Sequence, residues 1–283
     1  MNQNKINKNI YSTIFSTEKK IVMGILNITK DSFYDGDKYN TDKKIIYQAK
    51  KMLDEGATII DIGAQSSRPG AKQISSEQEL KILIPTIKLL KKKLPDTNLS
   101  IDTFWSNTAS KCIALGADMI NDISAGNIDE KMLPTIAKIN KPYILMHMKG
   151  KPKNMQTNPT YINLVEEIKD FFKEKIQQLN SLGFKKIILD PGFGFGKTLE
   201  DNYKLMNQLN EFQQFKYPIL VGISRKSMIY NLLNGTANDA LNGTSILNTI
   251  ALQKGARILR VHDAKEAIEC IKINSFLNEK RRN

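Results

Sequence analysis

Several residue types are scarce in this chain of 283 residues, and each scarcity excludes a class of protein. The two cysteines, Cys112 and Cys270, stand in no metal-binding or redox spacing, so we expect reduced packing residues and no disulfide. No apolar run approaches the roughly 18 residues that a transmembrane helix requires. Residues 1–20 are polar and lack the apolar centre of a signal peptide. These features predict a cytoplasmic protein with no membrane segment.

Arginine is also scarce, because only six of the 42 basic residues are arginines. The lysines behind the net charge of +13 are spread over predicted helices, and no aromatic platform accompanies them, so we interpret them as solvated surface and not as a nucleic-acid site. Where lysine is the default cation, an arginine is the better candidate for planar, bidentate anion binding. We therefore consider Arg68, Arg225 and Arg260, which follow or end predicted strands, as candidate ligands of anions.

Short apolar runs alternate with segments of helical periodicity along the chain. The runs predict strands at 21–26, 58–62, 99–101, 119–120, 143–146, 187–189, 219–221 and 258–261. Helices are predicted at 43–53, 77–91, 107–115, 161–182, 201–212, 240–253 and 265–276. Strands that are apolar on both faces and alternate with helices favour a parallel sheet covered by helices. We predict a single (β/α)8 TIM barrel over residues 21–277, with an N-terminal extension (1–20) and a basic C-terminal tail (278–283); an open doubly wound sheet is the alternative.

The glycine-rich stretch 190–198 imitates two nucleotide-binding motifs and matches neither. Gly192 stands one place too close to Gly196 for a P-loop, and the third glycine comes one residue early for a dinucleotide fingerprint. The stretch instead predicts a buried strand that delivers Asp190 to a tight turn.

Polar residues end nearly every predicted strand, which is where a barrel places its chemistry. Asp102, Asn121 and Asp190 form an acceptor-rich set that suits a flat ligand with N–H groups on its edge, with Lys226 or Arg225 available for its carbonyl side or ring face. The alternative for each is a helix N-cap.

A second group of strand-end residues, Asn27, Arg260 and His262, is rich in donors and suits a phosphate group. Asn27 is also an oxygen ligand for Mg²⁺, which meets few protein groups besides substrate phosphates. His147, the other histidine, is interpreted as a packed or hydrogen-bonding residue. The long polar loops 29–40 and 64–76 are candidate lids, and Ser67 with Arg68 could bind a small anionic second substrate.

The chain resembles the dihydropteroate synthase family from about residue 21 to residue 270. The resemblance rests on these motifs, in the family's order: Met23-Gly24-Ile25-Leu26-Asn27, Asp61-Ile62-Gly63, Ser67-Arg68-Pro69-Gly70, Ile101-Asp102-Thr103, Ile120-Asn121-Asp122, Met146-His147-Met148, Asp190-Pro191-Gly192-Phe193-Gly194-Phe195-Gly196-Lys197-Thr198, Gly222-Ile223-Ser224-Arg225-Lys226-Ser227 and Arg260-Val261-His262-Asp263.

The resemblance implies a homodimeric, Mg²⁺-dependent transferase of folate synthesis and a target of sulfonamides. It would condense 6-hydroxymethyl-7,8-dihydropterin diphosphate with 4-aminobenzoate to give 7,8-dihydropteroate and diphosphate. It assigns the pterin to Asp102, Asn121, Asp190, Lys226, Met146, Phe195 and Gly222, and the diphosphate to Asn27, Arg260 and His262, with Asn27 as the metal ligand. It assigns aminobenzoate to Phe33, Ser67, Arg68, Pro69 and Ser227, and catalysis to Asp35, Asp190, Lys226 and Arg260.

The sequence departs from the family's pattern in both long loops. Lys30 and Asp37 replace a usual Pro and Gly, Gln65 replaces a usual Glu, and Ser67 replaces a usual Thr. These changes affect the aminobenzoate side and sulfonamide sensitivity more than the reaction. Two alternatives are a methyltransferase that passes a methyl group from a methyltetrahydrofolate to a corrinoid, and a basic RNA- or DNA-binding protein. The methyltransferase needs no diphosphate site, so the pair Arg260 and His262 disfavours it. The scattered lysines disfavour the nucleic-acid-binding protein.

Overall fold

A computed structural model describes residues 10–15, 19–28, 38–65, 73–150, 155 and 159–279, without the side chains of residues 38–40. Eight parallel strands form a closed barrel in sequence order, and β1 pairs with both β2 and β8. The strands are β1 (Ile21–Asn27), β2 (Ile59–Gly63), β3 (Asn98–Asp102), β4 (Met119–Asp122), β5 (Tyr143–Met146), β6 (Ile187–Asp190), β7 (Ile219–Val221) and β8 (Ala256–Val261). The predicted (β/α)8 barrel is confirmed, and the open doubly wound sheet is excluded by the pairing of β1 with β8.

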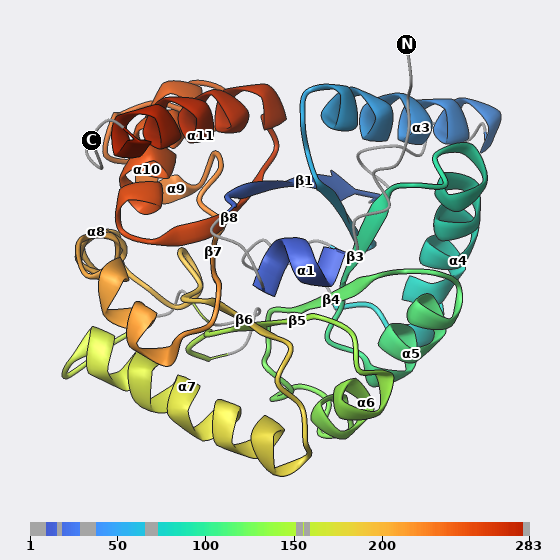
Figure 1. Ribbon diagram of the computed structural model, residues 1–283, viewed down its shortest axis with the longest axis horizontal. Coiled ribbons are helices and arrows are strands. Elements are labelled where there is room, and N and C mark those ends of the chain that lie inside the picture. The colour runs from blue at the N-terminus through green and yellow to red at the C-terminus, as the bar shows by residue number, and fades with distance from the viewer. Residues whose placement is uncertain are drawn as a thin grey trace.

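Helices surround the barrel as an outer ring (Figure 1). They are α3 (Lys38–Asp54), α4 (Ser76–Lys93), α5 (Ser106–Ala114), α6 (Met132–Ile139), α7 (Leu164–Ser181), α8 (Leu199–Asn207), the 3₁₀ helix η1 (Leu209–Phe215), α9 (Ser227–Tyr230), α10 (Leu241–Gln253) and α11 (Ala264–Glu279). Each predicted helix corresponds to one of these, except that the segment 201–212 is divided between α8 and η1. The short helices α6 and α9 were not predicted. Within the described residues, no helix combines the length and apolar character needed to cross a membrane.

Alternate residues of most strands belong to two different cores. In β1, Val22 packs with α3 residues such as Met52 in the large core beneath the helices, whereas Ile21 and Met23 belong to a core inside the barrel. This explains why the strands read as continuous apolar runs, since both faces are buried. The barrel interior is therefore filled with side chains and is not a pore.

A further helix, α1 (Ile10–Phe15), closes the N-terminal end of the barrel. Ile10 and Ile14 are buried in the interior core, against residues at the start of strands such as Ile21 and Ile59. Figure 1 shows α1 lying across the middle of the barrel. No secondary structure is predicted for this extension, and the described part of it is a plug whose apolar side completes the interior core.

Candidate active site

The carboxyl ends of the strands bring several predicted site residues to one level of the barrel. The register aligns Asn27 at the end of β1 with Gly63 at the end of β2, and Gly63 with Asp102 at the end of β3. On the next strand Asn121 is aligned with Asp102. Farther round the barrel, Met146 at the end of β5 is aligned with Asp190 at the end of β6. A single opening of the barrel thus collects residues that lie far apart in the sequence.

Arg260, which points from β8, joins two of the carboxylates. Its Nε donates to Asp61 Oδ2 at 2.7 Å, and its Nη2 donates to Asp102 Oδ2 at 2.8 Å. Asn121 Nδ2 also donates to Asp61 Oδ2, at 3.0 Å. Asp61 is fully buried, and its Oδ1 has no hydrogen-bond partner among the described residues. Asp61 therefore orients both Arg260 and Asn121, a role that the sequence did not reveal although Asp61 lies in a predicted strand.

Charge is concentrated around Asp102. Burial raises the pKa of the Asp102 carboxyl, the Arg260 guanidinium opposes that rise, and the nearby Asp61 and Glu79 carboxyls add to it. The net effect is a raised pKa, and Arg260 is the group that favours the charged form of Asp102. A ligand that donates N–H groups to Asp102 would supply the same stabilisation.

Asn27 lies next to this group. A Cβ atom placed on Gly63 would lie 3.1 Å from Asn27 Oδ1 and 3.7 Å from Asp102 Oδ2, so both oxygens border the space that the glycine leaves open. Among the described residues, no cluster of three or more His, Cys, Asp or Glu could hold a metal ion. A metal here would therefore depend on a few oxygen ligands of the protein and on substrate phosphates, which is the usual arrangement for Mg²⁺.

The glycine turn after β6 presents Asp190 and holds Lys226. Asp190 Oδ1 accepts the Gly192 amide at 2.8 Å. Lys226 Nζ donates to Phe193 O at 2.6 Å and lies 4.5 Å from the centroid of the Phe195 ring. Burial raises the pKa of Asp190, with Lys226 acting most strongly in the opposite direction. Burial lowers the pKa of Lys226 to about 8, and Asp190 opposes that fall, so each charge stabilises the other.

An apolar wall lies beside these charges. Met146 and Phe195 belong to a small buried cluster with Phe104, Ile123 and Met155. Gly222, after β7, lies against Arg260: a Cβ there would be 3.7 Å from Arg260 Cβ. This wall and the polar strand ends together make a site that suits a flat ring with a polar edge.

His262 lies at the rim of the site, after β8. Its backbone N–H donates to Ser224 Oγ at 3.1 Å, and its Nδ1 lies 3.1 Å from the same oxygen. The Ser224 hydroxyl can donate to Nδ1, and in that tautomer the imidazole proton is on Nε2. Loss of hydration at the ring and the charge of Arg260 lower the pKa of His262, although the residue as a whole is exposed. His262 is thus a neutral donor at neutral pH.

Arg225 has a structural partner. Its Nε and Nη2 donate to the two oxygens of Asp263 at 2.8 and 2.9 Å, and its Nη1 donates to the carbonyls of Ala237 and Asn238. The predicted alternative in which Arg225 meets the ring or carbonyl of a ligand is therefore not the arrangement seen; Arg225 joins the segment after β7 to the end of β8. Ser227, the first residue of α9, follows Lys226 directly and is exposed.

Five predicted residues lie outside the described residues: Phe33, Asp35, Ser67, Arg68 and Pro69. The base of the second long loop is described, and there Gln65 Nε2 donates to Glu79 Oε1 at 3.1 Å. Glu79 also accepts the Thr103 hydroxyl at 2.6 Å, and burial raises its pKa to about 7. The amide at position 65 therefore donates to a buried acid, whereas the family's usual Glu would place two acids together.

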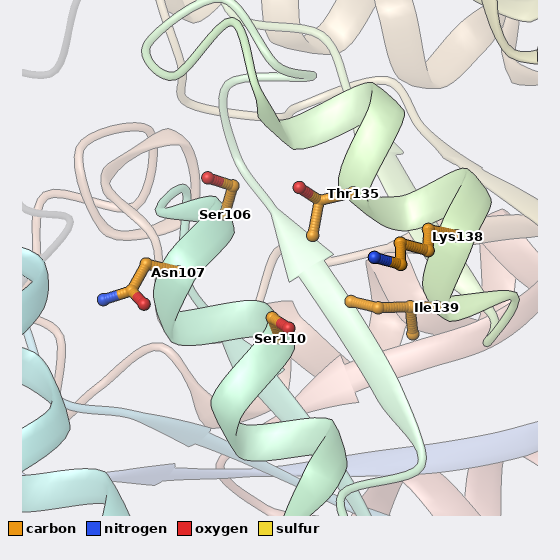
Figure 2. A pocket seen from close by; sticks show the side chains of 6 residues that line it. All are labelled: Ser106, Asn107, Ser110, Thr135, Lys138 and Ile139. Atoms are coloured by element: carbon orange, nitrogen blue, oxygen red, sulfur yellow. The ribbon is translucent and has the colours of Figure 1, made fainter.

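A hollow outside the barrel does not belong to this site. It lies between α5 and α6, has a volume of about 400 Å³ and is lined by Ser106, Asn107, Ser110, Thr135, Lys138 and Ile139 (Figure 2). The Ser106 amide at the start of α5 is already bonded to Asp129 Oδ2 at 2.8 Å, so this helix end has a negative partner. We interpret the hollow as a groove between two surface helices.

Comparison with known proteins identifies the family. The model of the pterin binding enzyme family matches residues 23–262. The dihydropteroate synthase of Haemophilus influenzae is 41% identical over 254 residues, which are 89% of this chain and 92% of that protein. A Yersinia pestis dihydropteroate synthase solved with a sulfonamide drug has a TM-score of 0.85 at 41% identity, covering 93% of this chain and 95% of that one.

A second solved relative is a Clostridium difficile dihydropteroate synthase crystallised in the presence of pteroic acid. It has a TM-score of 0.86 at 39% identity, and the match covers 92% of this chain and 97% of that chain. The whole barrel is therefore shared, and not the strand ends alone. The chain belongs to the pterin binding enzymes and, within them, to the dihydropteroate synthase family.

Proposed function

We propose that this chain is a transferase that condenses 6-hydroxymethyl-7,8-dihydropterin diphosphate with 4-aminobenzoate, giving 7,8-dihydropteroate and diphosphate in folate synthesis. The observation that carries the proposal is the group of Asp102, Asn121 and Asp190 at one barrel opening, beside the cations of Arg260 and Lys226. Acceptors for the N–H edge of a pterin thus adjoin a cation for its ring, Lys226, and a cation for its diphosphate, Arg260. Family membership over most of the chain supports the same reaction.

The pterin ring would lie between the polar strand ends and the apolar wall. Asp102 and Asp190 accept its N–H groups, and Asn121, whose amide nitrogen is bonded to Asp61, offers its oxygen. The ammonium group of Lys226 has three donors, and one of them is bonded to Phe193 O, in the turn after Asp190. Another can donate to a carbonyl or nitrogen of the ring. Met146 and Phe195 line the faces of the ring.

Arg260 would link pterin binding to diphosphate binding. In the structure its Nη2 is bonded to Asp102. A pterin that donates N–H groups to Asp102 replaces that bond, and the freed guanidinium donor can then bind a diphosphate oxygen together with His262 Nε2. Asp61 keeps its bond to Nε, so the guanidinium stays anchored during this exchange.

The reaction breaks the bond between the pterin methylene and the diphosphate oxygen, and both electrons leave with the diphosphate. Arg260 and His262 stabilise the leaving charge, while Asp190 stabilises the positive charge that spreads over the ring. The aminobenzoate amine then forms the C–N bond and loses a proton to solvent or diphosphate. The protein contributes orientation and charge stabilisation more than proton transfer.

The second substrate would approach from the side of Ser227 and the two long loops. Ser67, Arg68, Pro69 and Phe33 are proposed as its partners, and Asp35 as a catalytic residue of the first loop, by resemblance alone. Sulfonamides, one of which occupies a structure of the Yersinia pestis relative, would compete at this place.

Magnesium fits the oxygen-rich corner at Asn27 and is proposed as the cofactor. The Asn27 amide oxygen borders the open space beside Gly63, together with an oxygen of Asp102. The ion would neutralise the diphosphate as it leaves. Cys112 and Cys270 are free and buried, which fits a reducing compartment, so we place the enzyme in the cytoplasm.

Release of diphosphate tests the proposed function directly. Purified protein with pterin diphosphate, aminobenzoate and Mg²⁺ should release one diphosphate for each dihydropteroate formed. Chelation of the metal should reduce the rate at least about 10-fold, because Lewis-acid stabilisation is worth several kcal/mol, and added Mg²⁺ should restore it. Folded protein that releases no diphosphate would contradict the reaction, and an undiminished rate with chelator would contradict the metal alone.

A homodimer is proposed from an apolar surface on the last two helices. Ile246 of α10 and Ile273, Phe276 and Leu277 of α11 are each more than half exposed. The two helices pack side by side in the outer ring (Figure 1). Large apolar side chains exposed on neighbouring helices are candidates for an interaction site. A second copy of this chain is the partner that the family resemblance implies.

Replacement of Ile273 should separate the dimer. The wild-type protein should have twice the 32.0 kDa chain mass by light scattering, and Ile273→Glu should approach the single-chain mass, because a buried charge is costly at an apolar interface. Ile162→Glu, at another exposed isoleucine, is the matched control and should remain dimeric. A monomeric wild type, or dissociation of both variants alike, would contradict the proposed interface.

A further inference from the structure

Lys197 is a buried cation that the proposed reaction does not use. Its side chain is 3% exposed, in a chain whose other lysines are mostly at the surface. Its ammonium group has three donors and three partners: Gly192 O at 2.9 Å, Phe195 O at 3.2 Å and His147 Nδ1 at 3.1 Å. No carboxylate is among them. A charge is seldom buried on neutral acceptors alone, because burial without a counter-ion is costly.

The partners of Lys197 belong to two different segments. Gly192 O and Phe195 O are the two ends of the glycine turn after β6, and His147 follows β5. The turn is pressed against that second segment, since a Cβ on Gly192 would collide with the His147 carbonyl. Gly192 also has a φ of +73°, a conformation that glycine adopts at little cost. Phe193 and Phe195 anchor the turn in two apolar clusters, and Lys197 adds the polar ties that hold its backbone carbonyls against the segment after β5.

His147 is matched to this role. Burial, followed by the charges of Lys197 and Lys149, lowers the pKa of His147 well below its usual value, so the ring is neutral. A neutral imidazole can offer Nδ1 as an acceptor when its proton is on Nε2. The ring is held edge-on against Phe171, with centroids 5.0 Å apart. The predicted hydrogen-bonding role of His147 therefore corresponds to its position here.

The fastened turn presents the groups proposed to bind the pterin. Asp190 precedes it and accepts the Gly192 amide, Phe193 O accepts Lys226 Nζ, and the Phe195 ring lies beneath the same ammonium group. We infer that Lys197 is a positioning residue of the reaction: its three hydrogen bonds hold the turn so that Asp190, Phe195 and Lys226 meet the pterin ring, which Lys197 itself does not touch. This inference rests on the proposed function.

The charge of Lys197 also reaches Asp190. Titratable groups near Lys197 are Asp190 of β6, Lys226 after β7, Asp201 of α8 and His147 after β5. Burial lowers the pKa of Lys197 to about 7, opposed by Asp190, so Lys197 carries its charge on the acid side of neutrality. There it helps to keep Asp190 ionised. Loss of the cation should therefore move the pKa of Asp190 upward.

The test compares Lys197→Met with Lys175→Met. Lys175 is a buried lysine of α7 that donates to Asn127 Oδ1 at 2.6 Å and does not touch the turn. In Lys197→Met we expect kcat/KM for pterin diphosphate to fall on the order of 10²-fold, as for a misplacement of about 1 Å. The KM for aminobenzoate should stay unchanged, and binding of pteroic acid by calorimetry should weaken. Lys175→Met should lower the melting temperature and leave all these quantities unchanged.

The pH profile separates positioning from a loss of stability. The acid limb of kcat/KM for pterin diphosphate should move to higher pH in Lys197→Met and not in Lys175→Met. Lys197→Gln keeps hydrogen-bond donors for the two carbonyls but lacks the charge. It should therefore recover part of kcat/KM, while its acid limb should remain at the higher pH. If Lys197→Met does not fold, Lys197→Gln replaces it in the test. Equal behaviour of the variants at 197 and 175 would overturn the inference. An inactive wild type would instead overturn the proposed function.

Discussion

Asp190→Asn should remove at least about 2–3 kcal/mol of transition-state stabilisation, a loss of roughly 30- to 150-fold in kcat/KM for pterin diphosphate. The substitution keeps the shape of the side chain, and the amide oxygen can still accept the Gly192 N–H. It removes the negative charge that balances the ring cation and Lys226. We therefore expect the loss in both kcat and kcat/KM.

The pH dependence of this variant follows from the raised pKa of Asp190. Wild-type activity should fall as the pH decreases through that pKa, because the protonated acid carries no charge, and Asp190→Asn should lack this limb. Asp118→Asn is the control: Asp118 accepts the Leu99 amide and Lys91 away from the site, so its loss should affect stability only. Turnover like that of the wild type in Asp190→Asn would mean that the pterin lies elsewhere.

Arg260→Met should destabilise the protein by about 3–5 kcal/mol at neutral pH, since it leaves Asp61 and Asp102 as buried, uncompensated acids. Activity should fall at least about 100-fold as well, because the charged arginine contact to the leaving group is lost. Arg260→Lys should restore part of the stability and little of the activity, because one ammonium group cannot reproduce the paired geometry.

The destabilisation should depend on pH in a defined direction. Without Arg260, the pKa of the Asp102 carboxyl rises further above its unfolded value, so the folded state binds protons more readily. The stability of Arg260→Met should therefore recover as the pH falls, and its deficit in melting temperature should be larger at pH 8 than at pH 5. Arg225→Met, which loses the more exposed pair with Asp263, should show a smaller deficit with weak pH dependence. A deficit that grows toward low pH would refute the assignment of charges.

The barrel could be predicted because its strands are buried on both faces. Strands of this kind are continuous apolar runs, which can be recognised in the sequence without knowing which strands pair. Short helices could not be predicted. The six residues of α1 are stabilised by packing against the interior of the closed barrel, and α6 is too short to show a clear helical period. The division of the segment 201–212 between α8 and η1 likewise depends on local hydrogen bonds that periodicity does not reveal.

In the site, the strand-end rule predicted Asp102, Asn121 and Asp190. It could not predict that Arg260 reaches Asp61, since these residues are 199 positions apart and meet only because the barrel closes. The burial of Lys197 could not be predicted either, because no local sequence pattern distinguishes a buried lysine from a surface lysine. Chemistry at strand ends could thus be predicted from type and position, whereas the pairing of charges required the folded geometry.

The helix α1 limits where substrates can enter the barrel and where products can leave it. It seals the N-terminal end of a barrel whose interior is already filled by apolar side chains. Pterin diphosphate, aminobenzoate and both products must therefore use one doorway, at the carboxyl ends of the strands. Diphosphate that lingers there would stand in the path of the incoming amine. The single entrance thus follows from the filled interior and from the helix that caps its opposite end.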